Sequence, residues 1–391
     1  MNRPRTLGVV TVARSDYGIY QPVLREIARH RDLRLWIYAG GMHLSRRHGM
    51  TVRTIEADGH ALAGRVDFKL GAAESPREIA EAMGRGVAGF ARAFARRRPD
   101  LLVVLGDRYE MHAAALAALP LKIPVAHLHG GELTAGAMDD ALRHCLTKLS
   151  HLHFPAAREY ARRVAQLGEE PWRITLAGAP ALDRLRGFRP WPRAQLERKF
   201  GLDLSRPFLL ATFHPETLEY EDTVRHAGAF LGAIADSGLP AVFTLPNADT
   251  RGAEIARAIR RFVAADPQHR LVDNFGAEAY FSLMGLAAAM VGNSSSGLLE
   301  APSFGLPVVN IGRRQEGRLR ARNILDVPPR RAEIAAAVRK AVGAKFRAAL
   351  RGVRNPHGDG HAAERIVAVL RKVALGDRLL LKKFCDLQEK T

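Results

Sequence analysis

The chain has 391 residues, of which 47% are apolar and 25% are charged, and its formal net charge at pH 7 is +19. This length exceeds what one hydrophobic core usually organises, and the apolar content is sufficient for two folded domains, which excludes an intrinsically disordered chain. The two cysteines, Cys145 and Cys385, are too few for a disulfide framework and lack metal-ligand spacing, which fits a reducing compartment.

The sequence has no apolar stretch long enough to span a membrane, and its first residues enter a strand-like run without a signal-peptide pattern. We therefore expect a cytoplasmic protein with no membrane partner. The positive charge raises nucleic-acid binding as an alternative, but the arginines are scattered, with only Arg96, Arg97 and Arg98 in a short run, and no aromatic-rich strand offers a surface for stacking bases. An anionic small substrate explains the charge better, and no nucleic-acid partner is expected.

Short apolar runs alternate with amphipathic stretches through the first half of the chain. Between the first two runs, Tyr20, Val23, Leu24 and Ile27 have the spacing of a helix packed on a sheet. The alternation predicts parallel strands joined by crossover helices, and hence a Rossmann-like domain over residues 1–181. The expected strands of this domain cover residues 7–12, 33–41, 101–108, 123–131 and 174–180.

A stretch rich in proline and arginine at residues 182–195 interrupts the alternation, and strand-like runs then resume. We expect a second Rossmann-like domain over 182–365 and a helical tail over 366–391. The fold class is therefore α/β, with two Rossmann-like domains facing across a cleft. The expected strands of the second domain cover residues 208–214, 241–247, 270–274, 288–293 and 307–312.

Polar residues follow the predicted strands, and ligands of open α/β sheets bind beyond the carboxyl ends of the strands. Asp107 directly follows one apolar run and Glu132 ends the neighbouring run. Burial and mutual repulsion would raise the pKa of at least one of these carboxyls, giving the protonated and ionised pair that acid–base catalysis needs. The alternative is structural, with Asp107 paired to Arg108 and Glu132 capping the next helix.

The sequence GNSSSG at residues 292–297 lies between an apolar strand and a segment with helical spacing. Its backbone N–H groups and serine hydroxyls would then lie at a helix N-terminus, where the dipole favours a diphosphate. Plain N-capping by serine is the alternative. Glu300 follows within about two helical turns and would accept hydrogen bonds from a ribose diol, unless it is an ordinary solvated helix residue.

His214 ends another predicted strand, and Pro215 behind it favours extended backbone at the sheet edge. We expect this histidine to act at the diphosphate or in proton transfer. Five further histidines raise the possibility of zinc, but the pattern lacks a second pair at the spacing of zinc ligands and no cysteine assists, so no metal is expected. These histidines are His127, His129, His144, His151 and His153.

Eight motifs fall at the ends of the predicted strands, and the likeness that they carry extends over roughly residues 6 to 370. They are ARSDYG (13–18), GMHLS (41–45), GDRYEMHAAA (106–115), HLHGGELTAGAMDDALRHCLTKLSHLHF (127–154), HPETLE (214–219), PNADTRG (246–252), GNSSSGLLEAPSFGLPVVNIGRRQEGR (292–318) and NPHGDG (355–360). Together they resemble the hydrolysing UDP-N-acetylglucosamine 2-epimerases, including the bacterial enzymes of sialic-acid synthesis.

The resemblance implies a GT-B-like enzyme that eliminates UDP across C1 and C2 of the sugar and then adds water to the 2-acetamidoglycal. No cofactor is implied, and a homodimer or higher homo-oligomer is expected. By motif, Asp107 and Glu132 become the acid–base candidates, Asp139 and Asp140 support them, and His214 lies near the leaving diphosphate. The implied contacts to the UDP-sugar are Arg14, Ser294, Ser295 and Arg318 at the phosphates, Glu300 at the ribose and Tyr280 near the uracil. Further implied contacts to the UDP-sugar are Arg108, Asn293, Ser296 and Gly297.

The sugar itself stays open. UDP-N-acetylglucosamine, which would give N-acetylmannosamine, is the first expectation, and UDP-N,N'-diacetylbacillosamine, which differs at C4 and C6, is the alternative. A non-hydrolysing 2-epimerase, a GT-B glycosyltransferase and a non-enzymatic nucleotide-binding protein are the competing functions.

Overall fold

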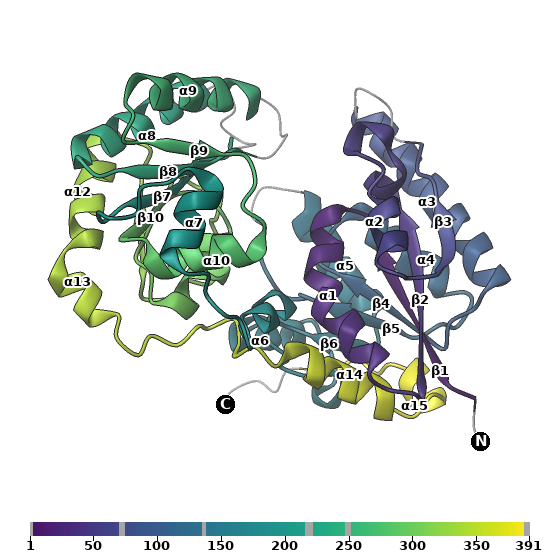
Figure 1. Cartoon of the computed structure of the whole chain (residues 1–391). Coiled ribbons are helices and arrows are strands. Elements are labelled where there is room, and N and C mark those ends of the chain that lie inside the picture. Colours follow the sequence, from purple (N-terminus) through teal and green to yellow (C-terminus); the bar gives the residue numbers. More distant parts are fainter. Residues whose placement is uncertain (1–2, 70–74, 135–137, 216–221, 247–251, 387–391) are drawn as a thin grey trace. The chain divides into compact units, whose positions relative to one another are not determined.

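The computed structural model describes residues 3–69, 75–134, 138–215, 222–246 and 252–386. The chain forms two compact units, one built from residues 1–186 together with 357–391 and the other from residues 187–356. Each unit holds one six-stranded parallel sheet with its own hydrophobic core (Figure 1). None of the helices in the described ranges is long and apolar enough to cross a membrane.

The first unit has the strand order of a doubly wound nucleotide-binding sheet, β3-β2-β1-β4-β5-β6. The order in which the strands are added to the sheet reverses between β1 and β4, and in sheets of this kind ligands bind at the carboxyl ends of the two strands where the order reverses. The strands are β1 (Arg5–Thr11), β2 (Leu33–Gly40), β3 (Leu62–Val66), β4 (Leu101–Leu105), β5 (Val125–Leu128) and β6 (Leu152–Phe154).

Helices cover the sheet of the first unit and bury apolar side chains against it. In α1 the predicted positions Tyr20, Val23, Leu24 and Ile27 are all buried, which confirms the helix expected there. The helices are α1 (Arg14–Ala28), α2 (Val52–Ala57), α3 (Pro76–Arg96), α4 (Tyr109–Ala118), α5 (Met138–Leu149), α6 (Arg158–Gln166), α14 (Ala362–Lys372) and α15 (Asp377–Leu380).

The sheet of the second unit repeats the same topology, with the order β12-β11-β10-β7-β8-β9. Its reversal point lies between β7 and β10, which are the first and fourth strands of the unit, as β1 and β4 are in the first. The strands are β7 (Leu209–Thr212), β8 (Ala241–Thr244), β9 (Arg270–Val272), β10 (Ala289–Gly292), β11 (Val308–Ile311) and β12 (Ile324–Val327). The helices are α7 (Arg193–Phe200), α8 (Thr223–Ser237), α9 (Gly252–Ala265), α10 (Ala277–Leu286), α11 (Ser296–Leu299), α12 (Arg331–Val342) and α13 (Ala344–Ala349).

The C-terminal segment differs from its expected place, because residues 357–391 pack on the first unit and do not follow the second domain as a separate tail. Ile366, Val367 and Leu370 of α14 belong to the core of the first unit, and Figure 1 shows α14 beside α1. The buried Arg173 donates from Nη1 to the carbonyl of Leu379 at 2.8 Å. The periodicity of α14 predicts a helix, but periodicity does not say which sheet the helix covers.

One expected strand was wrong and three short strands were missed. Residues 174–180 form only an isolated bridge, between Ile174 and His153, before Pro180 starts a short 3₁₀ turn. The missed strands are β3, β6 and β12, which have three to five residues and lie toward the sheet edges. Such short, partly polar strands carry little periodic signal.

Candidate active site

Two charged groups meet at the reversal point of the first sheet. The carboxylate of Asp16, at the start of α1, accepts the N–H groups of Val12 at 3.2 Å and Ala13 at 3.0 Å. Burial raises the pKa of Asp16 to about 6, while the nearby charge of Arg108 opposes the rise. Arg108 itself pairs with the fully buried Glu110 at 3.0 Å, so this predicted substrate contact already has an anionic partner within the fold.

Arg143 of α5 is the central cation at the ends of β4 and β5. Its buried guanidinium donates from Nη2 to the carboxylate of Asp107 and, at 3.1 Å, to the Thr134 hydroxyl, and from Nη1 to the carbonyl of His129 at 2.8 Å. The same Nη1 lies 3.9 Å from Oε2 of Glu132. The structure thus brings Asp107 and Glu132 to one guanidinium, and the alternative pairing of Asp107 with Arg108 is not formed.

Sequence reasoning missed Arg143, although a signal for it was present. It follows Asp139 by four positions and Asp140 by three on α5, and residues with these spacings share one helix face. An arginine on the same face as two candidate acids was therefore identifiable as their counter-ion.

The two aspartates at the start of α5 have different roles. Burial, together with the negative charge of Asp107, raises the pKa of Asp139. Asp140 instead accepts the backbone N–H of Thr134 at 2.7 Å and lies 3.7 Å from His144. Asp139 is therefore the carboxyl whose pKa responds to Asp107, whereas Asp140 binds the backbone of Thr134.

Glu132 binds a histidine. Its Oε1 lies 2.6 Å from Nδ1 of His129, and His129 has a left-handed backbone with φ of 61°. The tight turn also requires Gly131, because a Cβ there would lie 2.3 Å from the carbonyl oxygen of Tyr160. The HGGE sequence thus directs one carboxylate and one imidazole to the end of β5.

At the reversal point of the second sheet, Asn293 and His214 link the ends of β10 and β7. The Asn293 side chain accepts the N–H of His214 at 2.7 Å and donates to its carbonyl at 2.9 Å. Gly292 permits this approach, because a Cβ there would lie 1.8 Å from the oxygen of Thr212. Burial, with a smaller effect of the Arg314 charge, lowers the pKa of His214 to about 4, so its ring is neutral at pH 7.

Two residues missed by the sequence reasoning, Arg314 and Gln315, extend this cluster. The carbonyl of Asn293 accepts from Gln315 at 2.9 Å and from Arg314 at 3.3 Å. Gln315 in turn accepts from Arg318 at 2.9 Å, so the predicted phosphate contact Arg318 joins Asn293 through one side chain. The signal was their position directly after β11, next to the strand that ends at Asn293.

The serine loop precedes a shorter helix than expected. The helix α11 has four residues and passes into a 3₁₀ turn over Ala301–Phe304, so its dipole is small. Ser295 is its N-cap, and Gly297 is buried within it. An anion here would depend more on serine hydroxyls and on nearby cations than on a helix terminus.

Tyr280 and Glu300 lie with this loop. Burial raises the pKa of Tyr280, and the nearby hydroxyl side chains of Thr212 and Ser296 oppose this rise. The charge of Glu300 acts on the same hydroxyl. The structure therefore groups Tyr280, Ser296 and Glu300 in the second unit, whereas Arg14 is an exposed first residue of α1 in the first unit.

The candidate zinc histidines are dispersed. His127 is held by the carbonyl of Gly106 at 2.7 Å and by Thr147 at 3.2 Å, and His153 pairs with the buried Glu169 at 2.8 Å. In the part of the chain that the structure describes, no group of three or more His, Cys, Asp or Glu side chains is arranged to hold a metal ion. The motif residues 216–219 and 247–251 lie outside the described residues.

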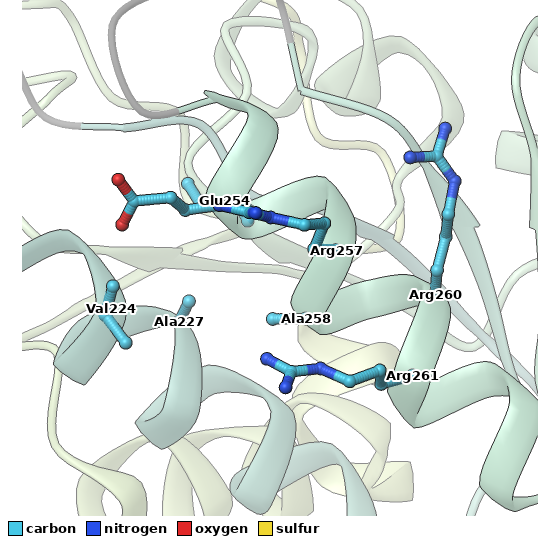
Figure 2. Close-up of a pocket in the computed structure, with 8 residues that line it drawn as sticks. Val224, Ala227, Glu254, Arg257, Ala258, Arg260 and Arg261 are labelled. Atoms are coloured by element: carbon cyan, nitrogen blue, oxygen red, sulfur yellow. The ribbon is translucent and has the colours of Figure 1, made fainter.

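An open pocket of about 490 Å³ lies between α8 and α9 of the second unit. Figure 2 shows its apolar Val224 and Ala227 on α8 and the arginines of α9, Arg257, Arg260 and Arg261. None of the predicted site residues lines this pocket. This pocket therefore does not support a catalytic site between α8 and α9.

Sequence comparisons identify the family of the chain. The model of the family described as UDP-N-acetylglucosamine 2-epimerase matches residues 25–371. The chain is 34% identical over 379 residues to the UDP-N,N'-diacetylbacillosamine 2-epimerase (hydrolyzing) of Legionella pneumophila, covering 97% of this chain and 98% of that protein. It is 36% identical over 324 residues to the GDP/UDP-N,N'-diacetylbacillosamine 2-epimerase (hydrolyzing) of Campylobacter jejuni, covering 82% and 84%.

A solved structure shows the same fold. The UDP-GlcNAc 2-epimerase of Neisseria meningitidis, bound to UDP-GlcNAc, superposes with a TM-score of 0.78 at 18% identity, covering 94% of this chain and 100% of that chain. The predicted fold class, α/β with two Rossmann-like domains of the GT-B type, is confirmed.

Asp16 predicts a specific pH dependence of stability. Its pKa is raised from 3.8 to about 6, so its contribution is fully present below pH 4 and is lost as the pH rises through 6. Raising the pH from 4 to 7 should therefore lower the unfolding free energy of the wild type by about 2 kcal/mol through this group, a loss that Asp16→Asn avoids. Urea denaturation of wild type and Asp16→Asn at pH 4 and at pH 7 measures this loss of unfolding free energy. Asp273→Asn, which changes an exposed aspartate, is the control. Parallel pH curves for Asp16→Asn and wild type would contradict the expected burial cost.

Proposed function

Because the chain belongs to the UDP-N-acetylglucosamine 2-epimerase family, we propose that it is a hydrolysing 2-epimerase that releases UDP from a UDP-linked 2-acetamido sugar. In the first step the C2 proton leaves, the C1–O bond to the diphosphate breaks, and a 2-acetamidoglycal forms. Water then adds at C1, and a proton is delivered to the opposite face of C2. The products are UDP and the free 2-epimer.

The proposed substrate is UDP-N,N'-diacetylbacillosamine, and UDP-N-acetylglucosamine is the second candidate. The names of the two relatives at 34% and 36% identity support the first. The description of the family and the Neisseria structure at 18% identity support the second. This order reverses the first expectation from the sequence.

The observation that carries the proposal is the group of acids at the ends of β4 and β5. Asp107 and Glu132 lie on one buried guanidinium, and the pKa of Asp139 is raised by burial and by Asp107. Inversion at C2 needs one group to remove a proton and another to return one from the opposite face. A set of acids with unequal proton affinity suits this requirement.

The second unit supplies groups that suit the nucleotide. C2–H is weakly acidic, so the enzyme must assist the departure of UDP by stabilising the charge that develops on the phosphate. Ser294 and the cations Arg314 and Arg318 gather around Asn293 and offer hydroxyl and guanidinium donors for that charge. We therefore assign UDP to the second unit and the sugar to the acids of the first.

The reaction is tested by incubating the protein with each UDP-sugar, measuring free UDP, and identifying the released sugar by NMR. We expect UDP to accumulate without an acceptor, together with a free sugar inverted at C2. The diacetamido substrate should be turned over faster than UDP-N-acetylglucosamine. Formation of a UDP-linked epimer without free UDP would indicate the non-hydrolysing reaction, and no turnover of either sugar would refute the proposal.

If the acids of the first unit act on the sugar and the second unit binds UDP, changes to these acids should impair catalysis without weakening UDP binding. Asp107→Asn and Glu132→Gln should each lower turnover by about a hundredfold or more, since each removes an acid from the set at the sugar. The affinity for UDP, measured by calorimetry, should stay within about threefold of wild type because the proposed UDP contacts lie in the second unit. Glu81→Gln, on the surface of α3, is the matched control. Unchanged turnover in both variants would remove the assignment.

A further inference from the structure

The backbone of His129 is held in an uncommon conformation from both sides. Its φ of 61° is in the left-handed region, which is unfavourable for a residue other than glycine unless the surroundings impose it. The N–H of His129 donates to the carbonyl of Phe154 at 3.2 Å, and its carbonyl accepts from Arg143 at 2.8 Å. The strain is therefore maintained by the ends of β5 and β6 and by α5.

The ring of His129 is oriented by Glu132. The 2.6 Å contact joins Nδ1 to Oε1 of an acceptor, so Nδ1 carries the proton of the neutral ring. The lone pair is then on Nε2. The ring is fixed both by its backbone and by a hydrogen bond.

The Nε2 atom of His129 is buried and has no hydrogen-bond partner among the described residues, while the residue as a whole is 8% exposed. A buried acceptor without a partner is unfavourable, so its retention needs an explanation. His153 makes a similar pair with Glu169, but it lies within β6, and Glu169 also binds Lys148 and Lys382. That pair joins the C-terminal segment to the unit, whereas His129 lies at the strand end beside the candidate acids.

We propose that Nε2 of His129 is the base that removes the C2 proton, and that Glu132 is a positioning residue acting through Nδ1. In this step Nε2 takes the proton, the C2–H electron pair forms the C1–C2 double bond, and the C1–O pair leaves with UDP. The imidazolium that forms is stabilised by the Glu132 carboxylate. The Asp107 and Asp139 pair then remains available for the opposite face of C2. This inference rests on the proposed function. It assigns the removal of the C2 proton to His129 and not to Glu132.

The test uses His129→Asn and His129→Gly, because asparagine tolerates and glycine favours a left-handed backbone. Both variants should keep the thermal unfolding midpoint near that of wild type. Turnover for UDP release should fall by about a hundredfold to ten-thousandfold, with KM within about threefold. In His129→Gly, imidazole added at millimolar concentration should restore at least about tenfold of the lost turnover, since the vacated space admits the missing base.

The matched control is Asp107→Asn with the same imidazole, which should show no recovery. Turnover of His129→Asn within threefold of wild type would overturn the proposal, as would a folded His129→Gly variant that imidazole does not rescue. Wild-type protein is assayed in parallel with both UDP-sugars. Failure of the wild type to release UDP refutes the proposed function and this inference together, whereas an active wild type with unaffected variants refutes only the role of His129.

Discussion

The arrangement at the candidate site depends on one buried cation, the guanidinium of Arg143. A charge in this position is unfavourable unless it is paired and hydrogen-bonded, and removing one partner of such a pair typically costs about 3–5 kcal/mol. Arg143 meets this requirement with Asp107, the Thr134 hydroxyl, the His129 carbonyl and the nearby Glu132. Two carboxylates that would otherwise repel each other are thereby held near one point, and the backbone of His129 is fixed in the same contact. Asp107, Glu132 and the backbone of His129 therefore all depend on the same cation.

The reversal point of the second sheet is built from neutral groups. This sheet has the same strand order as that of the first unit, and an amide links the two strand ends at its reversal point, with Asn293 bonded to both backbone groups of His214. One cation, Arg314, and the neutral amide of Gln315 reach this point from the segment after β11 and donate to the Asn293 carbonyl. A neutral frame with cations beside it suits an anionic diphosphate, whereas the acid-rich frame of the first unit suits proton transfer. The two repeats thus present different chemistry on the same scaffold.

The sequence predicted most of the fold and the strand ends at which the candidate site residues lie. Continuous apolar runs such as Leu101–Leu105 identify buried parallel strands, and polar residues after them locate the strand ends. The return of α14 to the first unit was not predictable, because helical periodicity does not specify the sheet on which a helix packs. The pairing of Glu132 with His129 was missed for a related reason: it depends on a left-handed turn that the residue types HGGE permit but do not require.

The central claim is that Arg143, Asp107 and their neighbours act as one unit, and a double-mutant cycle tests it most directly. UDP release is measured for wild type, Arg143→Met, Asp107→Asn and the double variant, with folding of each checked by its thermal midpoint. Residues that act as a unit are strongly non-additive, so the double variant should be no slower than the slower single variant within about threefold. Losses that multiply, so that the free-energy penalties of the two single changes simply add, would show that Arg143 and Asp107 act independently and would contradict the account.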